Sequence, residues 1–159
     1  MSAAAAGSSA QGRAASRPSA TTRRTVVQGG RAKAYRPLPT SARRAAVREG
    51  LEAYGRGDCF EAHELLEPAW MGSEDLAERD LVQGLIKLAA AYVHQIRGNP
   101  VGVAKNLRGA RDRLDAARDA EQTLPELATI DVTVLVAAID DRLARPDGVT
   151  EPAPGIPFR

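Results

Sequence analysis

Hydrophobic residues recur every three or four positions along most of this chain, the spacing that buries one face of an α-helix. The clearest case follows Asn99 and Pro100, which suit the N-cap and the first turn of a helix. Its apolar stripe consists of Val103, Leu107, Ala110, Leu114 and Ala117. The stripe predicts a helix from Pro100 to at least Ala117.

Four more segments have this periodicity together with boundary signals. Glycines after Tyr54 suit the end of a first helix, and Asp58 with Glu61 suits the capping box of a second one. Pro68 inside the second helix predicts a kink or an end nearby. The expected helices run from Thr40 or Ser41 to about Tyr54, from Asp58 to about Met71, from Glu74 (capped by Ser73) to Arg97, and from Asp131 to about Leu143.

The third of these helices is apolar on most sides, which is typical of the central helix of a bundle. Gly84 in its interior costs about 1 kcal/mol relative to alanine, so we expect a neighbouring helix to approach closely there. The patterns together predict an all-α fold, a single and largely up-and-down bundle of about five helices.

Composition supports this fold class. Aromatic residues make up 4% of the 159 residues, which disfavours a β-sandwich. A single cysteine, Cys59, excludes an intrachain disulfide. Apolar runs are too short to span a bilayer, so we expect no membrane partner and a cytoplasmic location.

Charge is distributed unevenly, with seven basic and no acidic residues in positions 1–39, against fifteen basic and twenty acidic residues in the rest. Because this first segment has few large apolar side chains, we expect a disordered tail there. It suits a solvated extension, an organelle transit peptide or a basic arm that contacts nucleic acid or the acidic domain. The predicted organisation is a tail over 1–39, a helical domain over 40–145 and a loose, proline-rich end over 146–159.

Both histidines occupy informative positions. His63 and Glu67 are four residues apart on the second helix, with Phe60 and Trp70 on either side of them. The third helix has one polar stripe, formed by Gln83, Lys87, Ala90 and His94. If that stripe faces the second helix, His94 and Gln83 meet His63 and Glu67.

The segment His63-Glu64-x-x-Glu67 resembles the His-Glu-x-x-His helix of zinc proteases with its last ligand replaced by a carboxylate. With His94 it offers two nitrogens and one oxygen, a set suited to Zn, Fe or Mn. Glu64 becomes a candidate general base if the helix turns it toward the site. A structural hydrogen-bond network, a metal or small-ligand site and a metal-free acid–base site all remain open.

Two longer blocks carry a more specific resemblance. Gly57-Asp58-Cys59-Phe60-Glu61-Ala62-His63-Glu64-Leu65-Leu66-Glu67-Pro68-Ala69-Trp70 and Gln83-Gly84-Leu85-Ile86-Lys87-Leu88-Ala89-Ala90-Ala91-Tyr92-Val93-His94 resemble the bacterial and archaeal family called domain of unknown function 309. The resemblance implies a small helical bundle and no assigned activity. Its signature positions here are His63, Glu64, Glu67, Trp70, Gln83, Gly84 and His94, with Tyr92 in the second block. Cys59 stands where the family tends to have an aromatic residue, at the rim of the candidate site.

The leading functional hypothesis is therefore a soluble binding or interaction module, built around the cluster of His63, Glu67 and His94, for a small-molecule or protein partner. The alternative is a metal-dependent hydrolase, so the sequence leaves enzymatic activity undecided. Arginines and aspartates alternate on the fourth helix, which indicates a solvated face and not a nucleic-acid surface. A homo-oligomer and a monomer both remain compatible with the apolar third helix.

Overall fold

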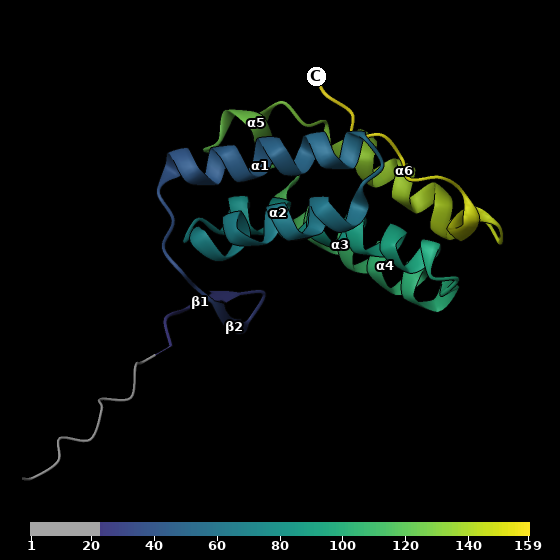
Figure 1. Cartoon of the computed structure of the whole chain (residues 1–159), viewed down its shortest axis with the longest axis horizontal. Coiled ribbons are helices and arrows are strands. Elements are labelled where there is room, and N and C mark those ends of the chain that lie inside the picture. The colour runs from purple at the N-terminus through teal and green to yellow at the C-terminus, as the bar shows by residue number, and fades with distance from the viewer. Residues whose placement is uncertain (1–22) are drawn as a thin grey trace, which may run out of the picture.

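Helices dominate the computed structural model, which describes residues 23–159 and confirms the all-α class (Figure 1). The described residues form six α-helices, one 3-10 helix and one small hairpin. The helices are α1 (Thr40–Gly55), α2 (Cys59–Gly72), α3 (Leu76–Ile96), α4 (Pro100–Ala117), α5 (Pro125–Ala128), α6 (Val132–Ala144) and the 3-10 helix η1 (Gly148–Thr150).

Side-chain caps set the starts of most long helices. Asp58 accepts a hydrogen bond from the Glu61 N–H at the start of α2, and Asp131 does the same for Val134 at the start of α6. The expected cap of α3 is corrected: Asp75, and not Ser73, accepts the Glu78 N–H at 2.8 Å. The Ser73 hydroxyl oxygen instead accepts the N–H of Asp75, so the helix begins two residues later than expected.

Two prolines lie inside or at the start of helices. The second helix continues past Pro68 and ends at Gly72, close to the expected end near Met71. Pro125 begins the short helix α5, which is not among the helices expected from the sequence, and its missing N–H is one that a first turn leaves unbonded in any case.

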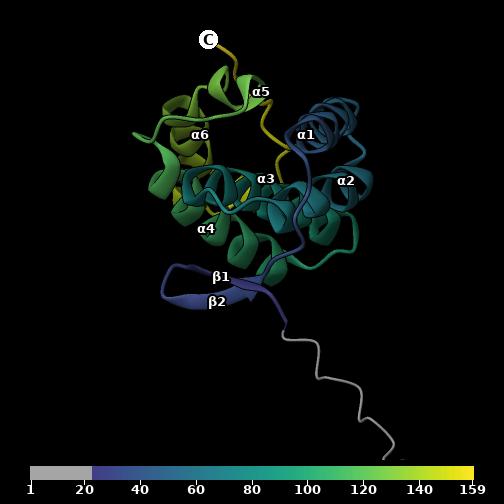
Figure 2. The same ribbon diagram turned by 90° about the vertical axis from the view of Figure 1, so that its left-hand side faces the viewer.

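The helix α3 lies in the middle of the bundle, between α2 and α4 (Figure 2). The helix α1 packs on α2, and α6 packs on α4. Gly84 explains the close approach of α3 and α4, because a Cβ there would lie 2.7 Å from Leu114 Cγ and 3.2 Å from the Leu114 backbone nitrogen. The expectation for Gly84 is confirmed by this packing.

An antiparallel hairpin of β1 (Thr25–Gln28) and β2 (Arg31–Ala34) lies beside the bundle (Figures 1 and 2). Its turn is Gly29-Gly30, with φ of +57° and +72°, the positive values that a tight two-residue hairpin turn requires. The expectation of disorder over 1–39 is thus wrong for the hairpin. Residues 1–22 of that predicted tail lie outside the described residues.

Polar side chains, and not an apolar core of its own, hold the hairpin against the helices. Gln28 is 1% exposed; it accepts a hydrogen bond from Trp70 Nε1 at 3.1 Å and donates one to Asp80 at 2.8 Å. Arg79 also donates to the Ala34 carbonyl oxygen of β2. These partners lie more than forty positions away in the sequence, so composition of the segment alone pointed to disorder.

The C-terminal segment 146–159 is also more ordered than expected. The Pro154 carbonyl oxygen accepts a hydrogen bond from the Tyr54 hydroxyl at 2.9 Å, and the Pro157 carbonyl oxygen accepts the Asp131 N–H at 2.8 Å. Phe158 forms an isolated β-bridge with Ile130. Proline lacks a donor but keeps its carbonyl acceptor, and these carbonyls fix the segment against α1 and the start of α6.

Among residues 23–159, the helices fall short of the length and hydrophobicity that a bilayer crossing requires.

Candidate functional site

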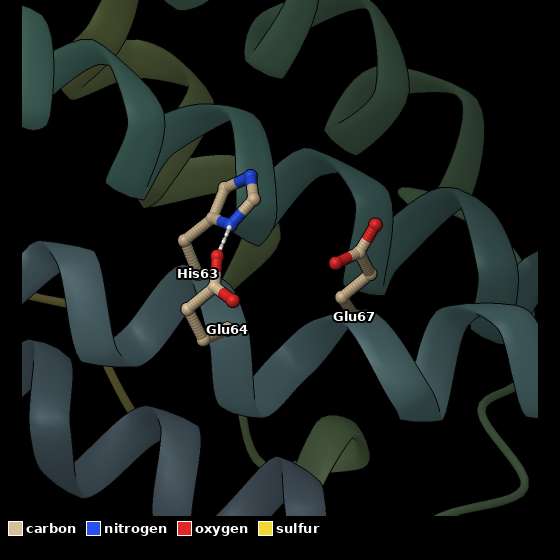
Figure 3. Close-up of side chains that lie close together, drawn as sticks. All are labelled: His63, Glu64 and Glu67. Carbon is tan, nitrogen blue, oxygen red and sulfur yellow. Dashed lines mark hydrogen bonds and ion pairs between the residues drawn. The ribbon is translucent and has the colours of Figure 1, made fainter.

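Three side chains from one stretch of α2 gather at its surface: His63, Glu64 and Glu67 (Figure 3). Each offers one possible ligand atom, and these atoms lie within 4.8 Å of one another. His63 Nδ1 and Glu64 Oε1 are 3.1 Å apart. Helical geometry brings Glu67 alongside His63 one turn later, as the sequence predicts. Glu64 is joined to the cluster through His63.

His63 stands between two shallow clefts that separate α2 from α3. The first, which we call the His94 cleft, has a volume of about 200 Å³ and is lined by Phe60, His63, Glu64, Ala90, Val93, His94 and Arg97. The second, the Lys87 cleft, has a volume of about 170 Å³ and is lined by His63, Glu67, Trp70, Gln83, Ile86, Lys87, Ala90 and Asn106. The polar stripe of α3 therefore lies along these clefts, opposite the cluster on α2.

His94 shares a cleft with His63 but takes no part in the group of close ligand atoms. Asn99 favours one tautomer of the neutral His94 imidazole ring. The Asn99 Oδ1 accepts the Gly102 N–H at the start of α4, so the Asn99 amide group faces His94 Nδ1 at 3.2 Å. An amide nitrogen is a donor only, so Nδ1 accepts and a neutral His94 carries its proton on Nε2. In this arrangement His94 offers a hydrogen-bond donor, and not a lone pair, through Nε2.

Gly102 makes this contact possible. A Cβ at position 102 would lie 2.6 Å from His94 Nδ1 and 2.7 Å from Asn99 Nδ2. The glycine thus leaves room for the imidazole where the start of α4 approaches the end of α3.

The remaining candidates divide between the clefts and the core. Phe60 is 59% exposed in the His94 cleft, while Gln83 lines the Lys87 cleft. Trp70 also lines the Lys87 cleft, although its indole N–H is bonded to Gln28. Tyr92 is a core residue that lines neither cleft, and burial raises the pKa of its hydroxyl. Cys59 is 4% exposed and lines neither cleft, so it does not form the rim that the sequence indicates.

The cluster does not tie the two helices together. His63 is bonded to Glu64 on its own helix, and within residues 23–159 no hydrogen bond joins His63 or Glu67 to α3. The structural network considered from the sequence is therefore not formed by these two residues. Gln83 Oε1 is buried and has no partner among the described residues.

Sequence reasoning missed two polar residues that shape this region. Arg79 is fully buried behind Trp70, with its guanidinium 4.8 Å from the ring centroid. Asn99 was recognised as a helix cap but not as the partner of His94. No local sequence pattern predicts that Arg79 is buried. An arginine between two acidic residues in the first turn of a helix has the same pattern as a solvent-exposed arginine.

Comparison with known proteins adds one finding. Residues 47–106 match the family model described as Domain of unknown function (DUF309). The matched residues include all of α2 and α3, and with them the lining of both clefts. No curated protein and no solved structure gives a significant match to the chain. Over residues 47–106, this chain is thus similar to the family described as Domain of unknown function (DUF309).

Proposed function

We propose that this protein binds a divalent transition-metal ion through His63, Glu64 and Glu67. The observation that supports the proposal is the approach of three ligand atoms within 4.8 Å on one stretch of α2. Imidazole and carboxylate together suit Zn, Fe or Mn. His94, the third ligand expected from the sequence, is replaced in this set by Glu64, because the ring of His94 does not belong to the group of close ligand atoms.

Glu64 has two available roles. It can bind the ion directly, or it can accept a hydrogen bond from His63 Nδ1–H while Nε2 of the same ring binds the ion. In the second role the carboxylate orients the imidazole and raises its basicity. Both roles use the contact at 3.1 Å, and both leave coordination positions open toward the clefts.

The alternative function is metal-assisted hydrolysis, which requires a substrate site in addition to metal binding. The clefts on both sides of His63 give a substrate room beside the ion, and the Nε2–H of His94 offers a hydrogen-bond donor across the His94 cleft. A binding role requires only the ligands on α2. Hydrolysis would additionally require His94, so His94→Ala separates the two: it should leave metal binding unchanged and abolish any hydrolysis.

Titration calorimetry on the chelator-stripped full chain, with Zn²⁺, Mn²⁺ and Fe²⁺ in turn, tests the proposal. We expect one ion per chain, with affinity reduced about tenfold or more in His63→Ala and Glu67→Gln. Glu61→Gln is the matched control, since Glu61 lies on the same helix and pairs with Arg56 outside both clefts. Absence of stoichiometric binding, or equal binding by His63→Ala and wild type, would overturn the proposal.

A further inference from the structure

The Lys87 cleft contains a lysine in an unusual setting. Lys87 extends from α3 across the surface of α4, where a Cβ on Gly109 would lie 3.0 Å from its Cδ and 3.3 Å from its Nζ. The side chain is partly buried by this contact. Gly109 therefore leaves room for the lysine side chain on the surface of α4.

Other cations surround Lys87. Burial lowers its pKa first, and Arg113, Lys33 and Lys105 lower it further by repulsion. Arg113 is compensated by Asp80 at 2.8 Å. Within residues 23–159, Lys33, Lys87 and Lys105 form no salt bridge, although the domain as a whole is acidic. Cations held together without acidic partners raise the local concentration of anions.

Two side chains that line the Lys87 cleft restrict which kinds of anion can bind there. Gln83 Oε1 is a buried acceptor without a partner among the described residues, so a ligand that reaches this atom stabilises it only by bringing a hydrogen-bond donor. Glu67 lines the same cleft and would repel a bare anion. A metal ion on His63 and Glu67 would offset that carboxylate and present a second positive group opposite Lys87.

We propose that the Lys87 cleft binds a phosphate group, held between Lys87 and the ion on His63 and Glu67. The part that involves the ion rests on the proposed metal binding. A monohydrogen phosphate combines acceptor oxygens for Lys87 with an O–H donor for Gln83 Oε1, whereas a carboxylate anion has no donor. The small volume of the cleft suits a free phosphate ion.

Titration calorimetry with inorganic phosphate near neutral pH tests the inference in two backgrounds. The first is the metal-loaded wild type. The second is metal-free Glu67→Gln, in which the repelling carboxylate is neutral and no ion is needed. We expect phosphate binding in both, and a loss of at least tenfold in affinity when Lys87→Met is added to either. Arg108→Met, which removes an exposed α4 cation outside the groups that act on Lys87, should bind phosphate like its parent.

The two proposals fail in different ways. If wild type takes up no metal but Glu67→Gln binds phosphate through Lys87, the phosphate site stands and metal binding is refuted. If metal binds while neither background binds phosphate, or if acetate binds as tightly as phosphate, the phosphate site is refuted. Glycerol 3-phosphate tests the donor, because its phosphoryl group is largely a dianion without an O–H near neutral pH and should bind less tightly than inorganic phosphate. Equal or tighter binding of glycerol 3-phosphate would contradict the role given to Gln83 Oε1. Elemental analysis and circular dichroism of the Lys87→Met variant confirm that its metal uptake and fold are unchanged.

Discussion

The guanidinium of Arg79 lies 4.8 Å from the ring centroid of Trp70 and donates a hydrogen bond of 2.8 Å to the carbonyl oxygen of the same residue. Arg79 also donates to the carbonyl oxygens of Ser73 and Ala34 and to Gln28 Oε1. One fully buried side chain thereby joins the end of α2, the start of α3 and the hairpin. Burial lowers the pKa of Arg79, in agreement with this enclosed position.

Replacing Arg79 should therefore destabilise the protein strongly. We expect Arg79→Lys to lower the free energy of unfolding by about 2–4 kcal/mol, because a lysine cannot supply the planar array of donors and leaves buried carbonyls unbonded. Urea denaturation followed by circular dichroism measures the change. The exposed Arg108→Lys should unfold like wild type, and an Arg79→Lys variant of wild-type stability would contradict the assigned role.

The close packing of α3 on α4 at Gly84 predicts that a larger residue there lowers the stability of the protein. Gly84→Ala adds a methyl group 2.7 Å from Leu114 Cγ, so α3 and α4 must separate, at a cost of about 1–3 kcal/mol. Gly55→Ala is the matched control, since Gly55 is helical and has open space around it. There, alanine should stabilise the protein by up to about 1 kcal/mol through its higher helix propensity. Thermal denaturation should show opposite shifts for the two variants, and shifts of the same sign would refute the packing argument.

The metal-ligand candidates should matter little for stability in the absence of an ion. The His63 side chain is 32% exposed, and its partner Glu64 is 56% exposed. We expect His63→Ala and Glu67→Ala each to change the unfolding free energy of metal-free protein by less than about 1 kcal/mol. A structural network between α2 and α3 would instead cost about 1–3 kcal/mol per variant. Chemical denaturation of chelator-treated samples distinguishes these results.

Acid stability should depend on the contact between α1 and α5. The hydrogen bond from Arg44 at 2.9 Å lowers the pKa of Glu126 below its ordinary 4.5. A carboxyl group with a lower pKa in the folded state stabilises the protein above its unfolded-state pKa, and this contribution disappears as the pH falls through the folded-state pKa. Wild type should thus lose more stability than Glu126→Gln between about pH 5 and pH 3. Denaturation series at several pH values check this, with the exposed Glu49→Gln as control; equal losses in Glu126→Gln and wild type would contradict it.

Local sequence signals were sufficient to predict that the five longer helices exist, because caps such as Asp58, Asn99 and Asp131 act within three residues of their own position. The close packing at Gly84 could also be predicted, since a glycine inside an apolar helix needs compensation. The sequence could not predict which helix the polar stripe of α3 faces. Periodicity shows which residues share a face of a helix, but it does not show which element packs against that face.

Long-range contacts account for what the sequence did not reveal. The hairpin depends on Gln28 reaching Trp70 and Asp80, and a single buried glutamine leaves no compositional trace. The C-terminal segment is held by backbone carbonyls, which every residue possesses, so its side chains do not distinguish it from a loose tail. The proton position on His94 depends on an amide of the next helix, which residue spacing does not reveal.

Because the hairpin is attached to the helices through Gln28, the fluorescence of Trp70 can report whether this attachment is intact. Trp70 is the only tryptophan in the sequence, and its indole N–H is bonded to the hairpin while its ring lies against Arg79. A two-stranded ribbon has little stability of its own, so it can detach while the helices stay folded. Fluorescence emission from Trp70 will register that detachment separately from the loss of helical ellipticity, and slow and fast classes of amide exchange should divide along the same boundary.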